Sequence, residues 1–126
     1  MKSTLMSIFI FLALLCFVFF ANNALIKLCD TISKSSEEIE ALINNKDWER
    51  AYSQTDEIIN LIDENQLLSS VYINHTELDN LMDEAVELSL YIDCRDHTES
   101  VIAVNSLKNF AKNIKHLHNP NIENIF

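Results

Sequence analysis

The sequence predicts an all-α protein, in which an N-terminal transmembrane helix is followed by an antiparallel up-down bundle of about four helices. An uncharged apolar segment lies near the N-terminus, apolar residues beyond it recur every three or four positions, and the 126 residues include no glycine. The recurrence indicates amphipathic helices, and the lack of glycine removes the usual hairpin turns. We divide the chain into the span (1–23), an acidic helical bundle (24–119) and a C-terminal tail (120–126).

The apolar segment from Leu5 to Ala21 contains no charge and holds five of the seven phenylalanines of the chain. As a helix it would be roughly 25 Å long, close to the roughly 30 Å hydrocarbon thickness of a bilayer. Lys2 followed by an apolar run also fits a cleaved signal peptide, but Phe19 occupies a place where cleavage before Asn22 requires a small residue. We expect a retained signal anchor, and the alternative is a secreted helical protein.

Negative charge is concentrated after this segment. All but one of the 19 acidic residues lie between Asp30 and Glu99, and the net charge is −10. Such an acidic domain gains nothing from lying against an anionic cytoplasmic leaflet, so we expect a cytoplasmic N-terminus and a bundle outside the cell membrane. We expect no nucleic-acid partner, because phosphate contacts require clustered Lys and Arg.

Four amphipathic stretches follow the span, and each can bury one narrow face only, against the others. The polar run at 33–36 interrupts the first stretch. Whether that helix continues unbroken from the span through Asn22 and Asn23 stays open. The predicted stripes are Leu25, Leu28, Ile32, Ile39, Leu42 and Ile43; Trp48, Tyr52, Thr55, Ile59 and Ile62, extended through Leu68 and Val71; Leu78, Leu81, Met82, Ala85, Leu88 and Ile92; and Ala103, Leu107, Phe110, Ile114 and Leu117.

Asp47 and Asp96 each precede a helical stretch, 49 residues apart. An aspartate at the N-cap accepts hydrogen bonds from amides in the first turn of a helix. Glu99 forms a capping-box-like pair with Asp96, and Thr76 is the candidate start of the third helix. The aspartates therefore mark two tight corners at one end of the bundle, where Trp48 is expected to be a core anchor. An internal duplication is left open.

Cys29 and Cys94 are predicted to be free thiols. Cys16 lies in the span, Cys29 just beyond it and Cys94 at a far corner. In an up-down bundle Cys29 and Cys94 would be roughly 22 Å apart, beyond the reach of a disulfide, which is about 7 Å.

Residue patterns for catalysis or metal binding are sparse. His75 and Asp79 stand four apart and share a helix face, but two ligands do not make a metal site. We expect them to make a helix-start hydrogen bond or a contact between helices, and we expect no cofactor. Without glycine there is no nucleophile elbow or phosphate loop, so we expect no enzymatic activity.

Lys108, Lys112 and Lys115 lie on one flank of the fourth helix. They could contact lipid head groups, each contributing about 1 kcal/mol near an anionic surface. The interpretation we favour is pairing with acidic neighbours on the third helix, namely Asp83, Glu84 and Glu87.

Several short motifs, in order, resemble one known family. After the uncharged span come "DWERA" (47–51), "HTELDN" (75–80) and the closing "NIENI" (121–125). Together they resemble the small bacterial proteins of domain of unknown function 4363. The resemblance implies a membrane-anchored helical protein with no established activity.

The function we expect is that of a single-pass membrane protein whose bundle binds another envelope protein or a second copy, or forms a structural part of the envelope. The alternative is an extracytoplasmic ligand-sensing bundle with a site between its helices. A small-molecule ligand is not favoured.

Overall fold

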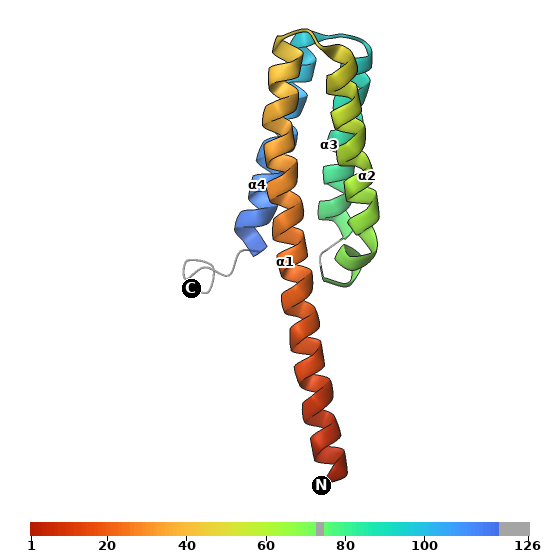
Figure 1. Ribbon diagram of the computed structural model, residues 1–126, viewed down its shortest axis with the longest axis vertical. Coiled ribbons are helices and arrows are strands. Elements are labelled where there is room, and N and C mark those ends of the chain that lie inside the picture. Colours follow the sequence, from red (N-terminus) through yellow and green to blue (C-terminus); the bar gives the residue numbers. More distant parts are fainter. Residues whose placement is uncertain (73–74, 119–126) are drawn as a thin grey trace.

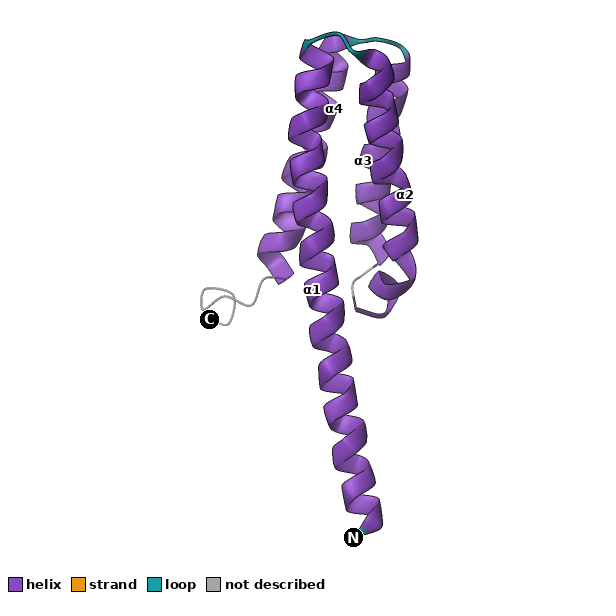
Figure 2. Ribbon diagram, in the orientation of Figure 1, coloured by secondary structure: helices purple, strands orange, loops and turns teal. Residues whose placement is uncertain are grey.

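The computed structural model describes residues 1–72 and 75–118, and in these residues it contains four helices. They are α1 (Lys2–Asn44), α2 (Trp48–Tyr72), α3 (His75–Asp93) and α4 (His97–His118). The α1–α2 and α3–α4 corners lie at one end of the bundle, and α2 meets α3 at the other end (Figure 1). Figure 2 shows helix everywhere in the described residues except the short connections. The predicted all-α up-down bundle is confirmed.

α1 is one uninterrupted helix of 43 residues. Its first half protrudes from the bundle and its second half is one of the four packed helices (Figure 1). The polar run at 33–36 does not break it, because Ser36 is buried and its hydroxyl donates to the Ile32 carbonyl at 2.7 Å. The question left open at Asn22 and Asn23 is answered, since the apolar segment and the first bundle helix are the same helix.

The four helices form a closed ring, in which each helix packs against its neighbours in the chain and α4 packs against α1. Buried positions alternate at spacings of three and four, the heptad pattern of coiled-coil-like bundles. These heptad positions are Leu25, Cys29, Ile32, Ser36, Ile39 and Ile43 on α1; Ala51, Thr55, Ile58 and Ile62 on α2; Leu78, Leu81, Ala85, Leu88 and Ile92 on α3; and Ser100, Val104, Leu107, Ala111 and Ile114 on α4.

The two helical hairpins, α1–α2 and α3–α4, share one register. Adding 49 to the heptad positions of α1 from Cys29 onward, and to those of α2, gives heptad positions of α3 and α4, as Ile39 and Leu88 illustrate. The offset equals seven heptads, so it keeps each helix face aligned. The bundle is therefore a structural repeat. We call two residues counterparts when they lie 49 positions apart.

The predicted stripe of α2 is wrong at Tyr52, which is 45 % exposed, and it omits Ala51 and Ile58, which are fully or almost fully buried. Ile59 is half-buried and packs against the core. A search for large apolar side chains selects Tyr52, whereas the small Ala51 is the residue that is buried in the core.

Other positions depart from the predicted stripes or fall outside the described residues. On α4, Leu117 is 65 % exposed, while Val104 and Ala111 are buried although the predicted stripe omits them. The side chains of Leu68 and Val71 and the tail 120–126 lie outside the described residues.

Candidate functional site

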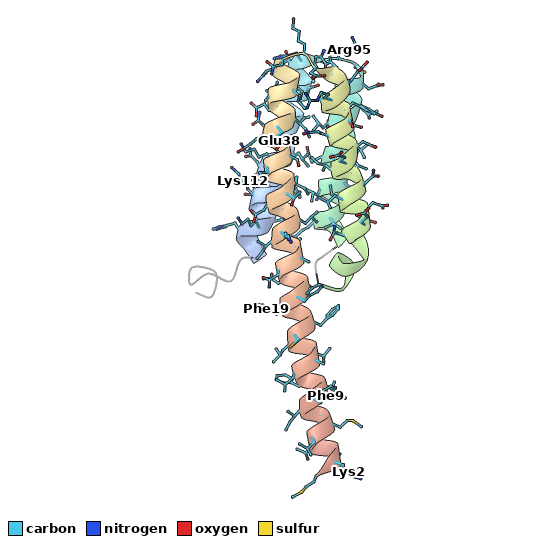
Figure 3. The ribbon with its side chains drawn as sticks, viewed as in Figure 1. Lys2, Phe9, Phe19, Glu38, Arg95 and Lys112 are labelled. Atoms are coloured by element: carbon cyan, nitrogen blue, oxygen red, sulfur yellow. The ribbon has the colours of Figure 1, made fainter. Side chains whose placement is uncertain are left out.

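The first half of α1 is an apolar rod that the rest of the described chain does not cover. Every residue from Met1 to Phe20 is exposed, and Phe9 and Phe19 are 72 % and 65 % exposed. Figure 3 shows these two side chains on the protruding part of the helix. The most apolar 18-residue window of α1 has a mean hydropathy of 2.7. The described chain thus has one helix long and apolar enough to cross a membrane, near its N-terminus.

The first corner, at the opposite end of the bundle, closes α1 with a Schellman motif. Lys46 has a left-handed φ of 59°, its amide donates to the Ile43 carbonyl at 3.0 Å, and the Asp47 amide donates to the Leu42 carbonyl at 2.9 Å. These bonds satisfy carbonyl groups in the last turn of α1. The Asp47 carboxylate then starts α2, because its Oδ1 accepts a hydrogen bond from the Arg50 amide at 3.4 Å in N-cap geometry.

The second corner repeats this arrangement. Arg95 has a φ of 56°, its amide donates to the Ile92 carbonyl at 2.9 Å, and the Asp96 amide donates to the Tyr91 carbonyl at 3.1 Å. Oδ1 of Asp96 accepts a hydrogen bond from the Glu99 amide at 3.1 Å. The reciprocal half of the predicted capping box is not formed, because the amide that Glu99 would bind already donates to Tyr91.

The start of α3 differs from its prediction. α3 begins at His75, so Thr76 lies inside the first turn and not before it. Asp79 is exposed on α3, and the side chain of His75 lies outside the described residues. Within the described part of the chain, no three His, Cys, Asp or Glu side chains gather closely enough to share a metal ion.

Trp48 lies half-buried at the first corner, where it packs against the hydrophobic core. It also borders a shallow hollow of about 320 Å³ between α2 and α3. The other residues that line this hollow are Glu49, Tyr52, Ile92, Asp93 and Arg95.

The lysine stripe of α4 pairs with α1. Nζ of Lys108 lies 3.0 Å from Oε1 of Glu37, and Nζ of Lys115 lies 2.6 Å from Oδ1 of Asp30. The hydrogen bond from Lys108 lowers the pKa of the Glu37 carboxyl below its ordinary value, and the charge of Lys112 adds to this effect. Figure 3 shows Lys112 on the outer side of α4.

Lys108 and Lys115 pair with acidic residues, as expected, but their partners lie on α1 and not on α3. Lys108 and Lys115 lie on the flank of α4 that packs against α1, which the periodicity of one helix cannot reveal. The predicted partners on α3 were Asp83, Glu84 and Glu87.

All three cysteines are free, which confirms the prediction for Cys29 and Cys94. They occupy three different environments. Cys16 is exposed on the apolar rod, Cys94 is exposed at the second corner, and Cys29 is buried in the bundle. Burial, with Asp30 beside it, raises the pKa of the Cys29 thiol to about 12.

The sequence prediction did not single out two exposed apolar residues on α3, Val86 and Leu90, which are 39 % and 60 % exposed. A comparison at the 49-residue offset would have found them, because their counterparts are Glu37 and Ala41. The surrounding charge is one-sided: α3 carries no Lys or Arg, and α2 carries only Arg50.

A known family matches most of the chain. The family described as "Domain of unknown function (DUF4363)" matches residues 19–125, from the end of the apolar rod through the whole bundle. The chain belongs to this family. No curated protein and no solved structure matches the chain. Membership of DUF4363 confirms the predicted resemblance and assigns no activity, so a function has to be argued from the geometry.

Proposed function

We propose that this DUF4363 protein is a single-pass membrane protein that holds an acidic helical bundle outside the cytoplasm and acts, without catalysis, by binding another protein of the cell envelope. The continuity of α1 gives the proposal its main support. The exposed apolar residues up to Phe20 pass without a break into the bundle, where burial begins at Ala21. A continuous helix keeps the bundle upright on its anchor.

This continuity would set the height of the bundle above the membrane. From Ala21 to Asn44 the helix rises about 35 Å. The two corners, with Trp48, Cys94 and Arg95, would therefore stand roughly that far from the lipid surface. Figure 3 shows Arg95 at the end of the molecule opposite Lys2. Such a bundle presents its corners and flanks to a neighbouring protein.

The charge of the bundle supports its placement outside the cytoplasm. The acidic residues cluster on the bundle, with all but one of the 19 between Asp30 and Glu99. An anionic cytoplasmic leaflet would repel such a domain, and the repulsion would act within about a Debye length of the surface.

The cysteines provide a test of topology. Intact cells that produce the full-length protein are treated with a membrane-impermeant maleimide and the modified cysteine is located by peptide mapping. We expect Cys94 to be labelled, because it is exposed at a corner, and Cys29 to remain unlabelled, because it is buried. Cys94→Ser should abolish labelling. Adding Asn45→Cys to that variant should restore it, because Asn45 is the exposed counterpart of Cys94.

Two results would contradict the proposal. Labelling of Cys94 only after lysis would place the bundle in the cytoplasm. A shortened protein released into the medium would show that the apolar segment is a cleaved signal peptide and that the bundle is not anchored.

A further inference from the structure

The structural repeat makes the α4–α1 and α2–α3 interfaces counterparts, so one serves as an internal reference for the other. At the outer edge of the α4–α1 interface, an ion pair between Lys108 and Glu37 joins the two helices. The counterparts of these two residues are Ile59 on α2 and Val86 on α3. At this level the edge is charged on one side of the bundle and apolar on the other, whereas the counterparts of Lys115 and Asp30 are the polar Gln66 and Asp79.

We name this apolar edge the α2–α3 seam. It consists of three residues from each helix, which are half-buried or exposed: Trp48, Tyr52 and Ile59 on α2, and Met82, Val86 and Leu90 on α3.

The α2 residues of the seam lie on the flank of α2 that faces α3. Trp48 and Tyr52 border the same hollow as Ile92 of α3. Ile59 lies seven positions after Tyr52, which is two helical turns on the same face.

The α3 residues of the seam lie on the flank that faces α2. Glu84 lines a hollow together with Ile102 of α4, so Glu84 marks the α4 flank of α3. Val86 follows two positions later, about 200° round the helix, and so points to the other flank. Met82 and Leu90 are each four positions from Val86 and share its face.

Packing against the core accounts for Trp48, Ile59 and Met82, but it does not explain why the exposed seam positions are apolar. Leu90, Val86 and Tyr52 are 60 %, 39 % and 45 % exposed, so each leaves much of its apolar surface in water. The counterpart hairpin folds with Ala41 in place of Leu90 and with Glu37 in place of Val86. An exposed apolar strip with no structural need marks an interaction surface.

The charge around the seam indicates the chemistry of its occupant. Exposed acidic side chains border the strip, with Asp56 and Asp63 each four positions after a seam residue of α2, and Asp83 three positions before Val86 on α3. The single basic residue of α2, Arg50, lies 3.8 Å from the Asp47 carboxylate. An apolar centre with acidic borders complements a helix that has an apolar face and basic edges.

We propose that the α2–α3 seam is a docking surface for a basic amphipathic helix of a partner protein. The inference deepens the proposed function and rests on its protein-binding role, for which it names the surface and the chemistry of the partner. From Met82 to Leu90 the seam rises about 12 Å, which matches roughly two turns of a docked helix. Apolar residues at positions i, i+3 or i+4 and i+7 of the partner would contact it.

The test uses the full-length protein in nanodiscs of zwitterionic lipid. The probe is a tryptophan-free helical peptide of leucine and lysine, with all leucines on one face. Trp48 is the only tryptophan of the chain and belongs to the seam, so its fluorescence reports binding there and not binding to lipid. We expect a saturable change that weakens with added salt, and about tenfold weaker binding of a scrambled peptide of the same composition.

Matched variants separate the apolar contact from simple charge attraction. Val86→Glu with Leu90→Ala converts both positions to their counterparts and adds a negative charge. Attraction by charge alone would tighten binding of the lysine peptide, whereas docking on the seam predicts about tenfold weaker binding. The control is Ile102→Ser, which changes a residue that is 57 % exposed on α4 to its counterpart and should leave the affinity unchanged.

Equal binding of the lysine peptide to the double variant, or of the scrambled peptide to the native protein, would overturn the proposal. So would a native dimer in sedimentation that the double variant dissociates, because a second copy would then occupy the seam. The titration uses isolated protein and does not depend on topology. The cysteine-labelling test can therefore contradict the proposed topology while the titration supports docking on the seam. The titration can likewise contradict docking while the labelling supports the topology.

Discussion

Asp47 and Asp96 occupy the same place in two copies of one corner. Oδ1 of Asp47 accepts a hydrogen bond from the amide three positions ahead at 3.4 Å, and Oδ1 of Asp96 does so at 3.1 Å. The amide of each donates to a carbonyl five positions back, at 2.9 and 3.1 Å. Each aspartate therefore ends one helix and begins the next, which makes the two hairpins register-matched halves of the bundle.

The caps should contribute measurably to stability. We expect Asp47→Ala and Asp96→Ala each to lower the free energy of unfolding by about 1 kcal/mol, because an N-terminal amide loses its acceptor. Asp→Asn at the same positions should cost less, because asparagine also caps well. Chemical denaturation of the full-length protein measures the effect, with the exposed Asp83→Ala as a control. A loss no larger than that of the control would show that the caps are not structural.

Glycine should be tolerated or stabilising at the two corner positions that have a left-handed φ. Lys46 and Arg95 have φ values of 59° and 56°, which cost a residue with a Cβ atom about 1 kcal/mol. We expect Lys46→Gly to leave the unfolding free energy unchanged or to raise it by up to about 1 kcal/mol. Lys34→Gly, the same change on an exposed position within α1, should lower it by about 1 kcal/mol. Equal losses at both sites would contradict the left-handed corner.

Two buried serines should respond in opposite ways to removal of their hydroxyl group. Oγ of Ser100 is buried with no hydrogen-bond partner, while Oγ of Ser36 donates to the Ile32 carbonyl at 2.7 Å. Ser100→Ala converts the residue to its counterpart, Ala51, and should raise the unfolding free energy by about 1 kcal/mol, because a buried unsatisfied group is removed. Ser36→Ala should lower it by about 1 kcal/mol. A loss on Ser100→Ala, measured by thermal or chemical denaturation, would show that this hydroxyl has a partner.

The ion pair at the α4–α1 interface predicts a pH dependence. Lys108 lowers the pKa of Glu37, so the pair contributes fully above the unfolded pKa of a glutamate and loses its contribution as the pH falls through the lowered folded pKa. We expect Lys108→Met to return the Glu37 pKa towards its ordinary value in an NMR titration. Lys112→Met should have a smaller effect, because Lys112 acts on Glu37 only through its charge. An unchanged Glu37 pKa in Lys108→Met would rule out the pair in solution.

Much of the architecture was predictable from local rules. The apolar segment, the helical periodicity and the aspartates before α2 and α4 each depend on a few neighbouring residues, and the structure contains the corresponding rod, helices and caps. Many of the positions that were missed are small or polar, such as Ala51, Ser36 and Ser100, although the apolar Ile58 and Val104 were missed as well. A search for large apolar side chains passes over the small and polar positions, although their heptad spacing identifies them.

The partners of the lysine stripe and the α2–α3 seam were not predictable in the same way. Both depend on which flank of a helix faces which neighbour, and hence on the order of helices around the bundle. Lys108 could have met α1 or α3, and the periodicity of α4 alone is the same in both arrangements. The counterpart relationship becomes useful only once the shared register of the two hairpins is known.

One unbroken helix joins the apolar rod to the bundle. Double electron–electron resonance measures the distance between two spin labels and tests this continuity directly. The labels are attached at Phe11→Cys and Glu38→Cys in a protein whose native cysteines are replaced by Cys16→Ser, Cys29→Ala and Cys94→Ser, and the protein is held in nanodiscs. The 27 intervening steps of α1 predict a single narrow distance distribution near about 40 Å. A broad or much shorter distribution would mean that α1 bends or breaks between the labels, for example at Asn22 and Asn23, and would contradict this continuity.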